Sequence, residues 1–453
     1  MRRVDLSAVI GAGFALWGFQ IGSAPFSDNS FFTHLATGRL ILDRGGIPRV
    51  DPYSTTAAGA DWVVQSWLFS GVVAGIEELA GPVGIQVFIG LLTAILGALA
   101  WRLTADAESI IPRIALTAAV VGVGSAFWSE RPALVGLIFL AVLRLRLERR
   151  TGPTWWIVPM MWVWVNVHGS FPLGVVLVAV WLVGNRADRR THPQEKALAL
   201  TTVGGVLLGA VNPLGLQLLL FPVELLGRSE VLRVVIEWQA PGFDTLGQQL
   251  FLLILAAAIV GVARSATWTD GLVVSVFVIA ALLGSRNLPV AALLIAPVAA
   301  RGLRGVGTIR GDRPLPFPAV FVTAAVLLFG VAVSGRSAGA QFNLRSYPVR
   351  ATAYLEAEGL SRPVTADIVG NFRELLFGEE AEAYFDDRFD MYPPEFVTDS
   401  VTLLRARPGA LDVLAEETVV LWESDAPLAT VLRVSPEWTV RFSDEHWVVF
   451  ERR

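Results

Sequence analysis

Two carboxylates near the N-terminus flank a short amphipathic stretch. Asp28 follows the first long apolar run of the chain, and Asp51 lies in the loop beyond that stretch. The sequence between them, "FFTHLATGRLIL" (residues 31–42), predicts an amphipathic helix that lies at a membrane interface. A carboxylate in this position can act as a general base toward an acceptor hydroxyl. Asp28 and Asp51 are therefore the predicted catalytic residues. Capping of the helix that follows is the alternative for Asp28.

A second group of polar residues is suited to an anionic substrate. Arginine forms bidentate hydrogen bonds with phosphate and is rarely placed at membrane depth without a partner. Arg131 and Arg286 therefore predict a site for the phosphate of a lipid, and an ion pair with Glu130, Glu237 or Asp244 is the alternative. A divalent cation, Mg²⁺ or Mn²⁺, stays open as a cofactor. The predicted substrate-binding residues are His34, Arg131, Asn166, His168, Glu237 and Arg286.

The two histidines of this set have plainer alternatives. His168 lies in "VNVHGS", where Asn166 and Ser170 crowd the end of an apolar run and Gly169 lets another group approach. A binding site and simple packing are equally open for it. His34 could hold a metal or a phosphate, and an ordinary hydrogen bond is the alternative.

The composition is that of a polytopic membrane protein. Of 453 residues, 54% are hydrophobic and 17% are charged, and the mean hydropathy is +0.57, which is high for a soluble chain. The net charge of -4 gives no reason to expect a nucleic-acid partner. The absence of cysteine excludes disulfides, thiolate metal sites and cysteine nucleophiles. Lys196 is the single lysine, so arginine carries nearly all the positive charge.

Apolar runs long enough to cross a membrane predict about eleven spans. The first is expected to be retained as a span and not cleaved as a signal peptide. The segment at 61–81 is predicted to be an interfacial or re-entrant helix that does not cross. The predicted spans lie at about 6–25, 84–101, 113–128, 133–147, 155–167, 170–185, 197–211, 248–264, 270–284, 288–302 and 317–334.

Arginine-rich loops set the orientation, because such loops stay in the cytoplasm. The basic segments are Arg2 with Arg3, then 144–150, 185–196 and 301–313. Their spacing predicts a multi-pass plasma-membrane protein with a cytoplasmic N-terminus and an extracytoplasmic C-terminal domain. The unusual polar residues then gather on the outer face. These outer loops are 129–134, 166–171, 212–215, 236–244 and 285–289.

The C-terminal tail differs in character from the rest of the chain. From about residue 335 to 453 charged residues are common, and strand-like runs alternate with helical ones, which predicts a small α/β domain. The domains expected are therefore a transmembrane domain at 1–334, with its first extracytoplasmic loop at 26–83, and an extracytoplasmic domain at 335–453. The strands are predicted at 362–368, 381–387, 417–423, 437–442 and 446–451, and the helices at 348–359 and 409–417.

Motifs for several other chemistries are absent from the sequence. It contains no Walker loop, no paired dinucleotide-binding glycine fingerprint and no HExxH. Any chemistry must therefore use a substrate that is already activated. A group linked to polyprenyl phosphate and delivered through the bilayer fits that need.

The order of the motifs resembles that of bacterial multi-span proteins related to the GT-C glycosyltransferases. The resemblance covers nearly the whole chain, and it implies a mainly helical GT-C-like fold, a polyprenyl-phosphate sugar donor and an acidic residue in the first outer loop. Asp28 is the best match to that acidic position and Asp51 the second. Asn29 stands where many relatives have a second acid. The matching motifs are "FFTHLATG" after Asp28, "GGIPRVDPYS", "WVVQSW", "ERPAL", "WVNVHGSF", "NPLG", "EWQAPGF", "SRNLP" and "YFDDRFDMYP".

Two functions follow from this pattern. The first is a membrane glycosyltransferase that moves a sugar from a polyprenyl-phosphate donor to a cell-envelope acceptor at the outer face. The alternative is a non-catalytic GT-C-like scaffold, or a partner subunit that docks another envelope protein. A transporter is disfavoured, because the middles of the predicted spans are nearly free of ionisable groups.

Overall fold

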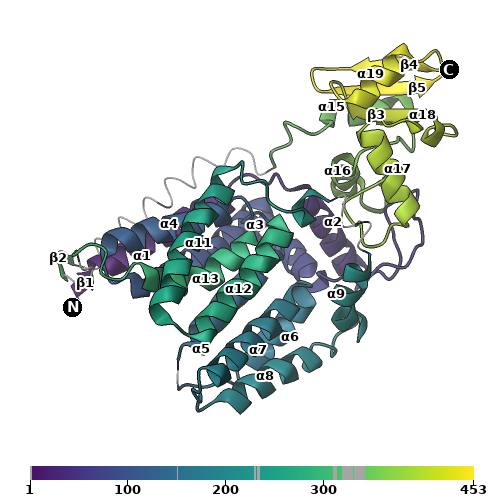
Figure 1. Cartoon of the computed structure of the whole chain (residues 1–453). Helices are drawn as coiled ribbons and strands as arrows, with labels where there is room; N and C mark the ends of the chain where they lie inside the picture. The colour runs from purple at the N-terminus through teal and green to yellow at the C-terminus, as the bar shows by residue number, and fades with distance from the viewer. Residues whose placement is uncertain are drawn as a thin grey trace. The chain divides into compact units, whose positions relative to one another are not determined.

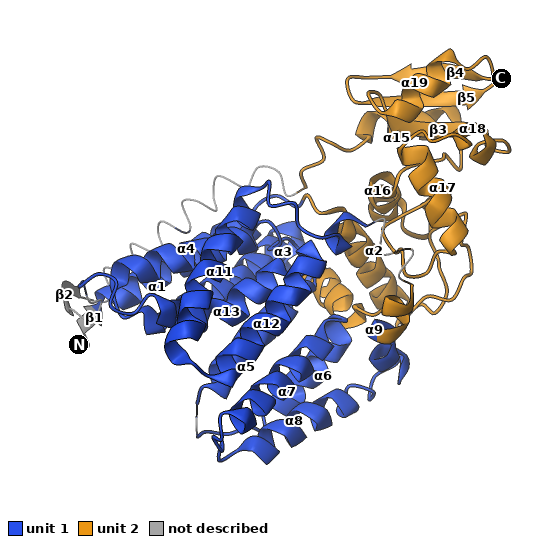
Figure 2. Cartoon of the chain, in the orientation of Figure 1, with its two compact units in different colours: residues 1–26, 79–222, 235–341 blue, residues 27–78, 223–234, 342–453 orange. Residues whose placement is uncertain are grey.

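The computed structural model describes residues 3–149, 151–228, 231, 235–309, 314–318, 330 and 342–453. Over these residues the chain is mainly helical, with a three-stranded sheet near the C-terminus (Figure 1). It divides into two compact units (Figure 2). Unit 1 comprises 1–26, 79–222 and 235–341, and unit 2 comprises 27–78, 223–234 and 342–453.

The predicted apolar runs of unit 1 form helices. One predicted span, at about 317–334, lies outside the described residues except for 317, 318 and 330. The helices are α1 (Leu6–Gly22), the second part of α3 (Trp67–Leu103), α4 (Ile110–Ser125), α5 (Ala133–Leu147), α6 (Ile157–Val167), α7 (Phe171–Ala187), α8 (Glu195–Leu208), α11 (Leu246–Ser265), α12 (Trp268–Leu283) and α13 (Leu288–Gly302). Short elements join them: η1 (Ala105–Ala107), η2 (Ile236–Trp238), η3 (Ser285–Asn287), and the paired strands β1 (Arg3–Asp5) and β2 (Pro314–Pro318).

Two helices of the described chain are long and apolar enough to cross a membrane. They are the helical stretch Trp67–Ala107 and the helix Leu246–Ser265. Six further apolar helices are shorter, and α9 (Gln217–Gly227), one of these six, was not predicted. The prediction of helices at the apolar runs is thus confirmed for the described residues, whereas the prediction that eleven segments cross a membrane is not.

Helix α3 is two helices joined at a bend. Gly81 has φ 64° and ψ -172°, which is not helical, and Pro82 follows it. Residues 67–78 of α3 belong to unit 2, and the residues from 79 onward, which include the bend, belong to unit 1. The sequence predicted a helix within 61–81 that is separate from the span at 84–101, and the bend lies between the two. That the first part of α3 does not cross a membrane stays a prediction.

Helix α13 is the central helix of unit 1. Nearly every residue from Leu288 to Gly302 is buried, and α11, α12 and α4 pack around it (Figure 1). Small residues allow the closest approach. A methyl group added at Gly261 of α11 would lie 2.0 Å from the carbonyl oxygen of Val298. Close backbone contact through glycine is a common way to pack helices in a membrane domain.

Unit 2 joins the first loop region to the C-terminal tail. Its helices are α2 (Asn29–Arg44), the first part of α3, the end of α9, α15 (Val349–Glu358), α16 (Asp367–Phe377), α17 (Pro394–Leu404), α18 (Ala410–Val413) and α19 (Pro427–Val434), with the short η4 (Gly378–Glu380). Its antiparallel sheet has the order β3 (Val419–Glu423), β5 (Trp447–Arg452), β4 (Trp438–Ser443). This division differs from the predicted boundary at 334/335, because 27–78 belongs to the same unit as 342–453.

The three C-terminal strands were predicted, and two other strand predictions were wrong. At 362–368 one bridge pairs Val364 with Val420, and α16 begins at Asp367. At 381–387 one bridge pairs Ala383 with Ser54. The alternation of apolar and acidic residues there suggested a strand with a solvent-facing side. The acidic side chains instead turn into buried contacts with their own loop and with α16.

Helix α2 has the amphipathic face that the sequence predicted. Phe31, Phe32, Leu35 and Leu40 are buried. The face packs on protein: Phe32 contacts Tyr347 with ring centroids 5.1 Å apart, and α2 packs along α16. An amphipathic pattern shows that one face is covered but does not identify whether lipid or protein covers it. The predicted amphipathic face is therefore confirmed, and for these residues protein covers it. A position of the helix at a membrane interface stays a prediction.

Candidate functional site

Asp28 caps helix α2. Its backbone is extended, and its Oδ1 accepts a hydrogen bond from the backbone N–H of Ser30 at 3.1 Å. Its carbonyl oxygen also accepts a hydrogen bond from the N–H of Phe31 at 3.1 Å. The structure therefore shows the capping contact that was one of the two roles left open. The role of general base stays a prediction.

His34 joins α2 to the first part of α3. Its Nδ1 lies 3.3 Å from the hydroxyl oxygen of Ser70, and its ring meets the edge of Phe69 with ring centroids 5.9 Å apart. The side chain is half-buried. This is the plain hydrogen-bonded environment that was the alternative to a metal or phosphate ligand.

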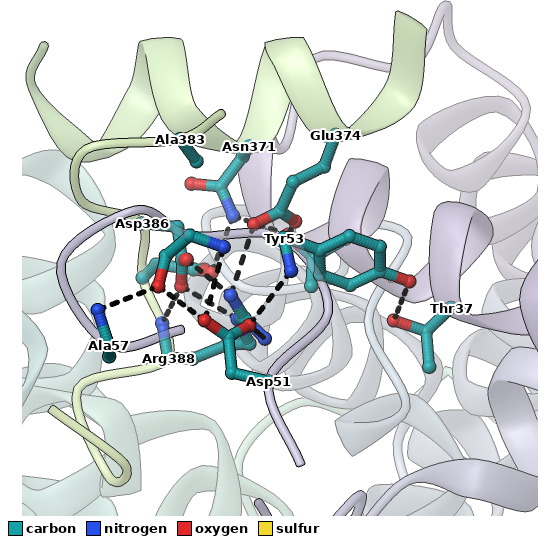
Figure 3. A network of polar contacts seen from close by, with 12 residues as sticks. Thr37, Asp51, Tyr53, Ala57, Asn371, Glu374, Ala383, Asp386 and Arg388 are labelled. Atoms are coloured by element: carbon teal, nitrogen blue, oxygen red, sulfur yellow. Dashed lines mark hydrogen bonds and ion pairs between the residues drawn. The ribbon is translucent and has the colours of Figure 1, made fainter. Parts of the chain in front are cut away.

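Asp51 is buried, pairs with Arg388 and stabilises the turn formed by the residues that follow it (Figure 3). Its carboxylate accepts hydrogen bonds from the N–H of Tyr53 and the N–H of Ser54, each at 3.1 Å, and from the hydroxyl of Ser54. Its Oδ1 lies 2.7 Å from Nη1 of Arg388. Because these groups surround the carboxylate and shield it from solvent, the geometry does not favour the predicted catalytic role of Asp51.

Arg388 stands at the centre of a charged cluster that the sequence prediction missed. Its Nε and Nη2 donate hydrogen bonds to the two oxygens of Asp386, at 2.9 and 2.6 Å. Nη2 also lies 3.4 Å from Oε1 of Glu374, and Nη1 faces Asp51 (Figure 3). We call these four residues the Arg388 cluster. Asp386 further accepts a hydrogen bond from the hydroxyl of Tyr392 at 2.6 Å.

Burial and neighbouring charge shift the pKa values of Glu374 and Asp386 in opposite directions. Burial raises the pKa of Glu374 well above its ordinary 4.5, and the charge of Asp386 raises it further. Burial would also raise the pKa of Asp386, but the charge and hydrogen bonds of Arg388 hold it below its ordinary value. The same two acids keep the pKa of Arg388 well above the usual range despite its burial.

Polar contacts extend from the cluster to the first turn of α2. The hydroxyl of Thr33 donates to Glu374. The amide nitrogen of Asn371 lies 2.6 Å from Thr33 Oγ1 and 2.6 Å from Asp387 Oδ1, and Asp387 accepts from the hydroxyl of Ser30. The turn that carries Asp28 at its cap is therefore fixed by side chains of α16 and of the loop after it.

In unit 1 the structure brings together three of the predicted binding residues. Arg131 Nη1 lies 2.7 Å from Oε1 of Glu237, and the guanidinium of Arg286 lies over the ring of Trp238 at 4.3 Å from its centre. The charges of Glu237 and Arg131 both act on Arg286. Arg131 thus has the ion pair with Glu237 that was the alternative to a phosphate.

Backbone contacts fix this arrangement. Ser285 N–H donates to the carbonyl oxygen of Gln239 at 2.8 Å, and the Ser285 hydroxyl donates to the carbonyl oxygen of Glu237 at 3.1 Å. These hydrogen bonds join η2 to η3, and they therefore fix the backbone positions of Glu237 and Arg286 relative to each other. We call Arg131, Glu237 and Arg286 the Arg131 group.

His168 and Asn166 lie where α6 ends. Nδ1 of His168 accepts a hydrogen bond from the N–H of Ser170 at 3.2 Å and lies 2.8 Å from its hydroxyl oxygen. Trp164 Nε1 donates to the same hydroxyl oxygen at 3.0 Å. The amide of Asn166 is buried and donates to the carbonyl oxygen of Trp162 at 2.8 Å. These contacts are those of a well-packed helix junction, and a binding role for the two residues stays a prediction.

Among the described residues, no group of three or more His, Asp or Glu side chains is arranged to hold a metal ion. The divalent cation that the sequence left open stays a prediction. Of the predicted site residues, Asp28, His34 and Asp51 belong to unit 2, and Arg131, Asn166, His168, Glu237 and Arg286 belong to unit 1.

One signal in the sequence pointed to the Arg388 cluster. The segment "YFDDRFDMYP" (residues 384–393) places acids beside an arginine within an apolar surrounding, and charges in such a setting are usually paired. The partners Asp51 and Glu374 could not be named, since they lie far away along the chain. In comparisons with known proteins, the sequence matches no protein-family model and no curated protein.

Proposed function

We propose that the chain is a membrane-bound glycosyltransferase that takes a sugar from a polyprenyl-phosphate donor and passes it to a cell-envelope acceptor at the outer membrane face. The observation that carries the proposal is the Arg131 group. Arg131 pairs with Glu237, and the charges of both residues act on the guanidinium of Arg286, so two arginines and one carboxylate lie in one group. A phosphate is the anion that such a pair of arginines recognises best.

The surroundings of the Arg131 group support a lipid substrate. Arg131 and Glu237 keep about a third of their side chains exposed, 31% and 40%, so an incoming anion can reach both. Apolar helices α11 and α12 flank the η2 and η3 segments. A substrate with a charged head and an apolar tail can therefore place its phosphate at the arginines while its tail stays along the helices. In this proposal unit 1 spans the membrane with the N-terminus in the cytoplasm.

The test is binding of a polyprenyl phosphate to the full chain in lipid nanodiscs, with the corresponding polyprenol as the ligand that lacks the charge. Removing a charge-assisted hydrogen bond costs roughly 1.5–3 kcal/mol, which is about tenfold or more in affinity. We expect Arg286→Ala to weaken binding of the phosphate by that factor and to leave binding of the polyprenol unchanged.

The matched control is Arg264→Ala. Arg264 lies in the last turn of α11, whose first turn follows the loop after η2, and a helix of this length separates its ends by about 30 Å. If both variants lose affinity equally, the loss reflects total charge and the proposed site is refuted. Wild-type protein that binds the phosphate no better than the polyprenol refutes it as well.

A second candidate is a non-catalytic scaffold or partner subunit of an envelope complex. The specific observation in its favour is that both predicted catalytic acids have structural partners: Asp28 caps α2, and Asp51 pairs with Arg388. A chain that binds no polyprenyl phosphate but assembles at fixed stoichiometry with an envelope protein would favour this candidate.

A further inference from the structure

The Arg388 cluster holds more acids than bases. The side chains of Asp51, Glu374 and Asp386 are all 0% exposed, and that of Arg388 is 6% exposed. With every acid ionised, the cluster would carry three negative charges against one positive charge. Uncompensated charge is strongly disfavoured in a buried site, and a buried acid in that situation takes up a proton instead.

The contacts of the three acids differ in how strongly they favour the ionised form. Asp51 accepts from two backbone N–H groups and one hydroxyl, and Asp386 accepts from Tyr392 and from Arg388 through both of its oxygens. Such donors favour the ionised form. Glu374 has the longest of the three contacts with Arg388, 3.4 Å against 2.6 and 2.7 Å. The charge of Asp386 also acts on Glu374 and disfavours its ionised form.

We propose that Glu374 keeps a proton in the folded chain, and that this proton makes the Arg388 cluster a pH-sensitive lock within unit 2. The lock joins two regions that are far apart in the sequence, residues 33–54 and residues 374–388. Glu374 is on α16, its partner Thr33 is on α2, and Asp51 holds the loop after α2. When the proton leaves, a second charge appears beside Asp386, and the contact between α16 and α2 weakens. This inference does not depend on the proposed function.

Burial has the largest effect on the pKa of Glu374 and raises it; the charge of Asp386 raises it further, whereas Arg388 and the hydrogen bond from Thr33 lower it. Burial raises the pKa of Tyr392 and of Tyr53 above the usual range, so both stay neutral. Arg388 stays charged. Two outer acids, Asp390 and Asp367, face Asp386, and burial raises the pKa of each, for Asp390 to about 6. The groups concerned are Thr33, Asp51, Tyr53, Asn371, Asp386, Asp387, Arg388 and Tyr392, with Glu379, Asp367 and Asp390 farther out.

The sign of the pH effect follows from the direction of the shift. The pKa of Glu374 is raised in the folded chain above its ordinary 4.5. Its contribution to stability is therefore complete below pH 4.5 and is lost as the pH rises through the folded-state pKa. Because Asp390 and Asp367 shift in the same direction, the contribution of Glu374 must be measured as a difference between two variants.

Glu374→Gln supplies that difference, since glutamine resembles the protonated acid in shape and cannot ionise. As the pH is raised from about 5 to about 8, we expect the thermal unfolding midpoint of the wild-type full chain in nanodiscs to decrease. The midpoint of Glu374→Gln should decrease less over the same range. The thermal midpoint of Glu374→Gln should therefore exceed that of the wild type by an amount that grows as the pH rises. The control Glu380→Gln makes the same change at an exposed position three residues after the end of α16, and its gap from wild type should not vary with pH.

A gap between wild type and Glu374→Gln that is independent of pH overturns the proposal. If the variant does not fold, hydrogen exchange of the wild type decides the question. After correction for the intrinsic pH dependence of exchange, protection of α2 and α16 should fall as the pH rises while that of α11 in unit 1 does not. Unchanged protection of α2 and α16 over the same range also overturns it.

Discussion

Arg388 Nη1 lies 2.7 Å from Asp51 Oδ1, and this buried contact ties the loop after α2 to the C-terminal tail. The two residues come from segments that the helices of unit 1 separate in the sequence, yet they share one compact unit. The cluster that they belong to explains why unit 2 includes residues from near the N-terminus. Without Arg388 the buried carboxylate of Asp51 would lose its cation, and without Asp51 the buried guanidinium of Arg388 would lose one of its anions.

Replacement of Arg388 should therefore destabilise unit 2 strongly. Arg388→Met keeps much of the volume of the side chain but leaves Asp51 and Asp386 without their cation. Removing one partner of a buried pair costs about 3–5 kcal/mol. We expect a lower thermal midpoint and protease cleavage within the tail at lower temperature. Arg362→Ala, at a side chain that is 74% exposed, should change stability by less than about 0.5 kcal/mol. Equal effects of the two changes would contradict the role assigned to Arg388.

The two roles left open for Asp28 can be separated by two substitutions. Asparagine is as good a helix cap as aspartate, whereas alanine costs about 1 kcal/mol at such a position. Asp28→Asn should therefore keep the stability of α2, and Asp28→Ala should lower it. If Asp28 is also the base in sugar transfer, Asp28→Asn abolishes transfer although the protein stays folded. Transfer retained by a folded Asp28→Asn protein would leave Asp28 with the capping role alone.

Helix packing in unit 1 should depend on Gly261. A methyl group there would lie 2.0 Å from the carbonyl oxygen of Val298, so Gly261→Ala must push α11 away from α13. Such overpacking costs about 1–3 kcal/mol. Gly13→Ala in α1 is the matched control, because no heavy atom lies within 4 Å of the added group, and alanine favours a helix. Thermal unfolding in nanodiscs should show a loss for the first variant and none for the second.

The orientation of the chain can be measured with reporters fused at several positions. The positive-inside rule predicts that a fusion after Arg453 is extracytoplasmic, and that fusions in the basic loops at 144–150 and 185–196 are cytoplasmic. A phosphatase active only outside and a fluorescent protein active only inside give opposite readouts at each site. A cytoplasmic C-terminus would contradict the proposed glycosyltransferase, because its acceptor lies at the outer face.

The sequence by itself determined the positions of most helices of unit 1 and of the last three strands. Long apolar runs predicted α5 and α13 to the residue and α4 to within three residues at each end. The alternating runs near the C-terminus predicted β3, β4 and β5. These predictions succeed because a local pattern of apolar residues sets which face of an element is buried, and backbone hydrogen bonds are satisfied within the element or with a neighbouring strand.

The tertiary structure alone decided which residues share a site. Helix α2 buries its apolar face on protein, and the acids of 381–387 turn inward to Arg388 and Asn371. Asp51 was predicted from its type and place, but its partner Arg388 was not. Periodicity reports that a side chain is buried and carries no information about its distant partner. The charge of a buried acid depends on that partner, and so the proton proposed for Glu374 follows only from contacts between residues that are far apart in the sequence.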